Sequence, residues 1–64
     1  MSRSSIESAI EAITTHDNPD MASGLAEGLV IAYFTSSAIT ADEFKSYCAR
    51  IRDVYLERTA RRAA

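Results

Sequence analysis

The side chains that could do chemistry are few in this 64-residue chain, and they do not gather into a known pattern. The single cysteine, Cys48, and the single histidine, His16, are far apart in the sequence. A structural zinc site needs four such ligands, and a cysteine nucleophile needs a base beside it. Gly24 and Gly28 lie inside a helical pattern, whereas a phosphate-binding loop places its glycines between a strand and a helix. We therefore expect no catalytic residue, no metal and no cofactor, and predict that the protein is not an enzyme.

The isolated titratable residues are better explained by local structure. Acids stand where helices are expected to begin, and there they interact favourably with the helix dipole; these are Asp17, Asp20, Asp42 and Glu43. His16 closes the first expected helix, where a cation would interact with the last carbonyl groups. Cys48 lies in an apolar stripe, where a thiol behaves as a small hydrophobic side chain.

Arginines concentrate at the carboxyl end, and Arg58, Arg61 and Arg62 could contact phosphates. The formal net charge of −2 and the pI of about 5.2 argue against a chain built mainly to bind nucleic acid. Asp53 and Glu57 also interrupt the basic run. A dimeric regulator that binds RNA or DNA through its last helix is therefore the second of two functional hypotheses.

The middle of the chain predicts the helix around which the other elements pack. Between residues 21 and 36 the only charge is Glu27. Asn18 suits the N-cap and Pro19 the first helical position, so we place this central helix at residues 19–36. Its apolar residues extend around most of the helical wheel, which is typical of a helix that packs against two neighbours.

Small residues recur at every fourth position of the central helix, at Gly24, Gly28 and Ala32. Each interior glycine costs a helix about 1 kcal/mol relative to alanine, which suggests that the small side chains serve the close approach of another helix. We predict a helix-packing or dimer ridge here. It consists of Gly24, Gly28, Ala32, Leu25, Leu29, Ile31, Tyr33 and Phe34.

A short amphipathic helix is predicted before the central one, over residues 5–15. Ser4 and Glu7 fit a capping box, and isoleucines spaced three or four apart follow them. A helix of this length is too short to be stable alone in water, so it must pack against another element. The sequence leaves open whether that element belongs to the same chain or to a second copy.

The last helix is predicted over residues 40–61. Thr40 and Glu43 form a capping box, and Ile39 and Phe44 are placed for a hydrophobic staple. The short connection from the central helix favours an antiparallel neighbour. We therefore predict an all-α fold and one small domain over residues 1–64, a helical hairpin with a short N-terminal helix, assembled as a homodimeric helical bundle.

A candidate partner surface lies on the last helix. Leu56 stands apart from the apolar stripe, beside Lys45 and Arg52 on the helical wheel, and we add Tyr55, at the edge of the stripe, to this surface. Together with the absence of catalytic residues, this surface supports our first hypothesis, an interaction protein that binds another protein and inhibits or regulates it. A phage- or plasmid-type accessory protein fits this description.

Self-association is expected because a chain of this size forms a marginal core, and one cysteine allows no internal disulfide. The lone thiol suits the reducing cytoplasm. Residues 21–40 are long enough to cross a bilayer, but they contain Glu27 and two glycines. We therefore expect a cytoplasmic homo-oligomer with a protein partner of unknown identity and no membrane association.

Overall fold

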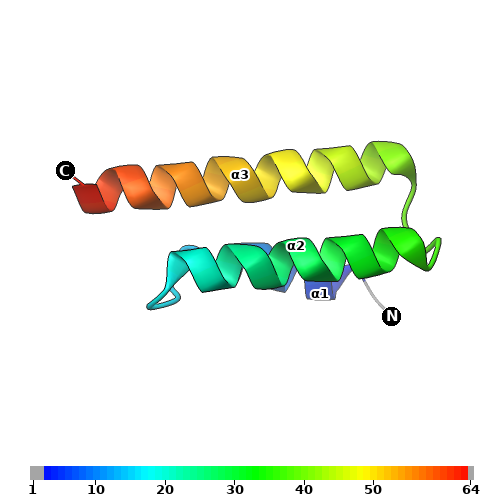
Figure 1. Ribbon diagram of the computed structural model, residues 1–64, viewed down its shortest axis with the longest axis horizontal. Helices are drawn as coiled ribbons and strands as arrows, with labels where there is room; N and C mark the ends of the chain where they lie inside the picture. The colour runs from blue at the N-terminus through cyan, green and yellow to red at the C-terminus, as the bar shows by residue number, and fades with distance from the viewer. Residues whose placement is uncertain (1–2, 64) are drawn as a thin grey trace.

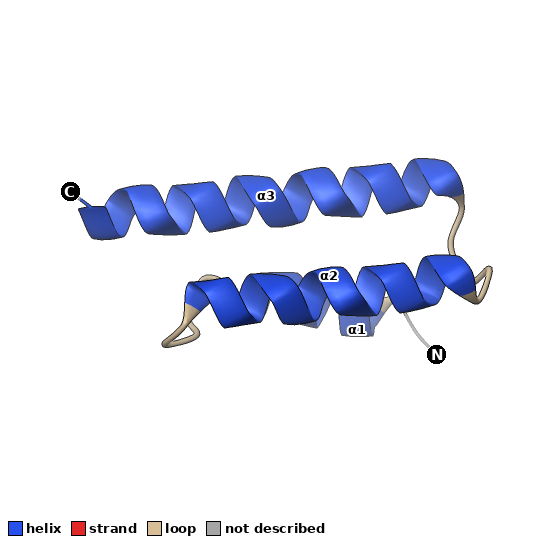
Figure 2. Ribbon diagram, in the orientation of Figure 1, coloured by secondary structure: helices blue, strands red, loops and turns tan. Residues whose placement is uncertain are grey.

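The structure, a computed structural model, describes residues 3–63, with side chains as far as Arg61. It contains three helices, α1 (Ser4–Ala12), α2 (Pro19–Thr35) and α3 (Ala41–Ala63), and the described residues form no strand. α2 and α3 lie side by side and antiparallel, and α1 packs behind them, mainly against α2 (Figures 1 and 2). The prediction of an all-helical protein is confirmed.

α1 begins one residue earlier than predicted, and the capping box expected at Ser4 is wrong. Arg3 occupies the N-cap position and makes no side-chain capping bond. The Glu7 carboxylate instead accepts two hydrogen bonds from the Arg50 guanidinium of α3, with N–O distances of 2.8 and 2.6 Å. The guanidinium offers the carboxylate two charged donors, whereas a capping contact offers one neutral backbone amide, so the long-range contact prevails over the local one.

α1 ends at Ala12, earlier than the predicted residue 15. The amides of residues 13–15 each donate to the carbonyl three positions back, which tightens the chain into a 3₁₀-like turn. After this turn, His16 Nδ1 accepts a hydrogen bond of 2.9 Å from the Asn18 amide. Among the described residues, the His16 ring thus bonds to the amide just before α2, and no hydrogen bond joins it to the last carbonyl groups of α1.

α2 begins where the sequence predicts. Asn18 Oδ1 accepts a hydrogen bond of 3.1 Å from the Met21 amide, and Pro19 is the first helical residue. The proline has no amide hydrogen to leave unpaired in the first turn, and its fixed φ suits the helix. This start depends only on neighbouring residues, which is why the sequence predicts it correctly.

The carboxyl end of α2 is a Schellman motif without glycine. The Ser37 amide donates to the Phe34 carbonyl at 3.0 Å, and the Ala38 amide donates to the Tyr33 carbonyl at 2.8 Å. Ser37 adopts a φ of 65°, in the left-handed region that the motif requires. A residue with a Cβ is strained in this region, and a glycine is not.

Replacing Ser37 with glycine is expected to raise the free energy of unfolding by about 1 kcal/mol, because the strain at this exposed position is removed. Urea denaturation followed by circular dichroism measures the change. Ser36→Gly is the matched control, since Ser36 has a φ of −88° and gains nothing from glycine. A Ser37→Gly protein less stable than wild type would contradict this account of the turn.

The start of α3 confirms the second capping box. Thr40 Oγ1 accepts a hydrogen bond of 3.1 Å from the Glu43 amide, and Glu43 Oε1 accepts one of 2.9 Å from the Thr40 amide. Glu43 also forms an ion pair of 2.8 Å with Arg3. The Thr40 amide, helped by the Arg3 charge, lowers the pKa of the Glu43 carboxyl. One carboxylate thus caps α3 and binds the chain just before α1.

The core lies between the three helices and includes residues from both connections. Its buried side chains are Ile6, Ile10, Ile13, Ala22, Ala26, Val30, Tyr33, Ile39 and Ile51. Ala22 and Ala26, 3% and 0% exposed, are four residues apart on the buried side of α2, where small side chains allow close helix packing. The first helix therefore packs within its own chain, which the sequence left open.

Candidate interaction surfaces

The outer face of α2 is the first candidate surface, and we define it by Met21, Gly24, Leu25, Gly28, Ile31 and Ala32. All six residues are exposed, and none carries a charge. Met21, Leu25 and Ile31 are 55%, 64% and 49% exposed. A Cβ added at Gly24 or Gly28 would meet nothing within 4 Å. The described chain therefore leaves this apolar face open to solvent.

The predicted ridge on the central helix is divided between the surface and the core. Five of its members lie on the outer face: Gly24, Leu25, Gly28, Ile31 and Ala32. Tyr33 is buried and Leu29 is partly buried against the core. Phe34 stacks on Phe44 of α3, with a distance of 4.6 Å between ring centroids. The helical wheel shows that α2 is apolar on most sides but does not show which arc of the helix faces inward, so it could not separate the exposed members of the ridge from the buried ones.

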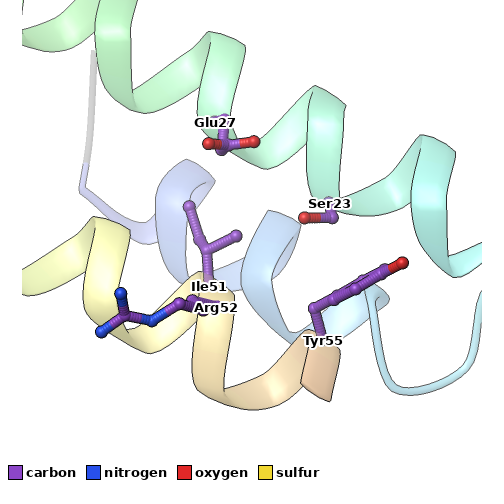
Figure 3. Close-up of a pocket in the computed structure, with 5 residues that line it drawn as sticks. All are labelled: Ser23, Glu27, Ile51, Arg52 and Tyr55. Carbon is purple, nitrogen blue, oxygen red and sulfur yellow. The ribbon is translucent and has the colours of Figure 1, made fainter. Parts of the chain in front are cut away.

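The second candidate surface is a groove of about 300 Å³ between α2 and α3. Ser23 and Glu27 of α2 form one wall, and Arg52 and Tyr55 of α3 form the other (Figure 3). Ile51 lies between the walls, and it is 2% exposed. α1 lies behind the groove in Figure 3, so the opening is on the broad side of the hairpin opposite α1.

The predicted partner surface on α3 contributes half of this groove. Arg52 and Tyr55 line it, while Lys45 and Leu56 are exposed beside it by helical spacing. The opposite wall was missed, because residues on two helices are matched only when the hairpin forms. The one available signal was that Glu27 is the sole charge in a long apolar stretch.

The groove carries opposite charges on its two walls. Among residues 3–61, neither Glu27 nor Arg52 takes part in an ion pair. Tyr55 donates a hydrogen bond to the Asp20 carboxylate, and this bond and the negative charge of Asp20 raise the pKa of the Tyr55 hydroxyl. The tyrosine is therefore held as a neutral donor at one end of the groove.

Cys48 packs against the core beside the groove, as its place in the apolar stripe predicted. Burial raises the pKa of the thiol, and the negative charge of Glu27 adds to this effect. Because the thiolate is the nucleophilic form, the surroundings of Cys48 disfavour covalent chemistry. The side chain serves packing.

Two arginines of α3 hold α1 and the residue that follows it in place. Arg58 Nη1 donates a hydrogen bond of 2.7 Å to the Ile13 carbonyl, and Arg50 binds Glu7. Arg61 is exposed, and the side chain of Arg62 lies outside the described part of the chain. The predicted nucleic-acid contact thus loses Arg58 to an internal role, and no observation favours this hypothesis over the first.

Acid is expected to weaken the protein partly through Glu7. The Arg50 hydrogen bonds lower the pKa of Glu7 from its ordinary value of 4.5. A carboxyl with a lowered folded-state pKa stabilises the fold above its unfolded-state pKa and loses this contribution as pH falls through the folded-state value. Glu7→Gln should therefore flatten the fall in melting temperature below about pH 4.5, measured by circular dichroism.

Glu11→Gln is the matched control for this acid dependence, because Glu11 is an exposed acid of the same helix with no ion pair among residues 3–61. Its curve should follow wild type. Identical acid curves for wild type and Glu7→Gln would show that the Arg50 pair does not contribute.

Neither a metal site, nor a membrane-spanning helix, nor a likeness to a known protein points to a function for this chain. Among the described residues, no group of three or more His, Cys, Asp or Glu side chains is placed to hold a metal ion. No helix in that part of the chain has the length and apolar character needed to cross a membrane. The chain matches no model of a known protein family, no curated protein and no solved structure. The two surfaces are therefore the features of the molecule that bear on its function.

Proposed function

We propose that this protein is a small, non-enzymatic interaction module that binds another protein through the outer face of α2 and thereby inhibits or regulates it. The observation that carries the proposal is the exposure of Met21, Leu25 and Ile31 on a face without charge. Contiguous apolar surface on a small protein is costly in water and marks binding sites. No helix of the described chain covers it.

The shape of this face favours a partner with a concave surface. α2 has 17 residues and is therefore about 25 Å long. A strip of that length and about 10 Å wide is far smaller than the roughly 800 Å² per partner of a stable interface. A second convex helix would cover little more than this strip, whereas an apolar groove can enclose the ridge from both sides.

The glycines support the same arrangement. With no side chains at Gly24 and Gly28, the partner can approach the backbone of α2 while Leu25 and Ile31 fill pockets on either side. Two interior glycines cost the helix about 2 kcal/mol in total. The closer contact with the partner must contribute more free energy of binding than this cost. The sequence suggested that Gly24, Gly28 and Ala32 serve self-association. We instead assign these three residues to the contact with the other protein.

A photo-crosslinking amino acid at Leu25 tests this function in the native host. The same group at Asp53, an exposed residue of α3, is the control. We expect one defined protein to be captured from position 25 and not from position 53. The purified partner should bind the wild-type chain and change its own activity on binding.

Leu25→Glu completes the test because it places a charge in the centre of the face without disturbing the core. It should weaken binding of the purified partner by roughly a hundredfold, as expected for a central apolar contact, while leaving the thermal melt unchanged. Equal capture from both positions, or a purified partner that binds Leu25→Glu as tightly as wild type, would overturn the proposal.

A further inference from the structure

We propose that the groove between α2 and α3 is the interface with a second copy of this chain, in a two-fold dimer whose axis runs along the groove. The outer face of α2 takes no part in this interface. The proposal therefore goes beyond the function proposed above, and each can fail without the other.

On the broad side opposite α1, α2 carries acidic side chains and α3 carries basic ones. On α2, the acids Asp20 and Glu27 are seven residues apart and therefore share one stripe. On α3, the bases Lys45 and Arg52 have the same spacing. Asp20 is already bound by Tyr55. The hairpin thus presents an acidic helix beside a basic helix on one open face, and the two charges that lie next to each other there are Glu27 and Arg52.

A two-fold axis along the groove turns this pattern into self-complementarity. It places α2 of one copy over α3 of the other, so that Glu27 faces Arg52 twice, once in each direction. Because the helices are antiparallel, Asp20 and Lys45 lie at opposite ends of the groove and do not form a second pair. Glu27 and Arg52 line the same groove and so lie at similar heights along the hairpin. A pure rotation keeps that height, and Glu27 of each copy therefore meets Arg52 of the second copy without any adjustment of register.

The other two-fold arrangement of the same faces is disfavoured by the same charges. An axis across the helices at the height of the groove would place α2 over α2 and α3 over α3, with Glu27 against Glu27 and Arg52 against Arg52. Like charges brought together at an interface are repulsive and select against that geometry. The charge order therefore distinguishes the two arrangements.

The broad side has the size and apolar content of a small dimer interface. The Cα trace measures 39 by 18 Å across this side, a rectangle of about 700 Å², compared with the roughly 800 Å² that each partner contributes to a standard interface. Phe34, seven residues after Glu27, and Leu56, four residues after Arg52, lie along the two charged stripes. They are 38% and 54% exposed and would be covered in the dimer.

Charge reversal tests the geometry. Sedimentation equilibrium at low salt measures the dimer Kd of wild type, Glu27→Arg, Arg52→Glu and the double variant. Each single reversal should weaken the dimer about tenfold, since symmetry repeats the repulsion at two contacts, and the double variant should recover an affinity near that of wild type. Glu27→Gln should also weaken the dimer. In the alternative arrangement, with α2 over α2, the same substitution would strengthen the dimer because it removes the repulsion between the two Glu27 side chains.

Two controls make each outcome decisive. Circular dichroism melts of the reversal variants at low concentration show that the single chain still folds. Leu25→Glu, on the outer face, should leave the dimer Kd unchanged. A wild-type chain that stays monomeric at high micromolar concentration, a double variant that does not recover, a Glu27→Gln variant that gains affinity, or a dimer lost in Leu25→Glu would each overturn the proposal.

Discussion

Replacing Ile51 with alanine is expected to remove most of the stability of the fold. Ile51 is 2% exposed and lies in the core between α3 and the other two helices. Truncating a buried isoleucine to alanine costs about 2–5 kcal/mol, through lost burial and the cavity that remains. A single core in a chain of this size supplies only about 3–5 kcal/mol. We therefore expect a broad, early thermal transition by circular dichroism at 222 nm.

The control for this experiment lies one and a half turns further along the same helix. Leu56 is 54% exposed and is not part of the core, so Leu56→Ala should change the free energy of unfolding by less than about 0.5 kcal/mol. Both substitutions replace a four-carbon side chain with a methyl group at a helical position. Equal effects of the two would mean that the described core does not hold the fold together.

The second large effect is a gain of stability. Replacing both Gly24 and Gly28 with alanine should raise the free energy of unfolding by about 2 kcal/mol, because alanine has the higher helix propensity at exposed interior positions. Neither new methyl group would meet another atom within 4 Å. Urea denaturation of the single chain at low concentration measures the change.

Ala26→Gly provides the matched comparison, since it makes the opposite change on the buried side of the same helix. Ala26 is 0% exposed, and the substitution should destabilise the fold through both propensity and lost packing. If the double alanine variant were instead less stable than wild type, Gly24 or Gly28 would have a packing role within the single chain. The partner proposal adds a separate expectation: Gly28→Leu should keep the fold and lose the partner.

The acid dependence, the Ser37 turn and the charge reversals concern different parts of the molecule. Glu7 and Arg50 connect α1 to α3, Ser37 shapes the end of α2, and Glu27 faces the groove. Their effects should be nearly additive, because no hydrogen bond or ion pair among the described residues joins one of these sites to another. Combining Ser37→Gly with Gly24→Ala and Gly28→Ala would therefore yield a more stable protein. Destabilising substitutions such as Ile51→Ala can then be measured in that protein while it still folds.

Local signals in the sequence determined where the two long helices begin. Asn18 with Pro19, and Thr40 with Glu43, bond only to residues within the first turn, so their geometry follows from the order of the amino acids alone. The spacing of apolar residues likewise determined the number, order and type of the helices. These features do not need a folded core to be recognised.

Only the tertiary structure decided which helix contacts formed and which surfaces stayed open. Glu7 binds Arg50, 43 residues away, in place of the expected capping partner. The packing of α1 against α2 decided that Ala22 and Ala26 face inward and that Gly24 and Gly28 face solvent. A helix apolar on most of its circumference can bury any arc of it, and the choice depends on the summed packing of all three helices. The functional surfaces, which are what that packing leaves uncovered, therefore could not be predicted from the sequence alone.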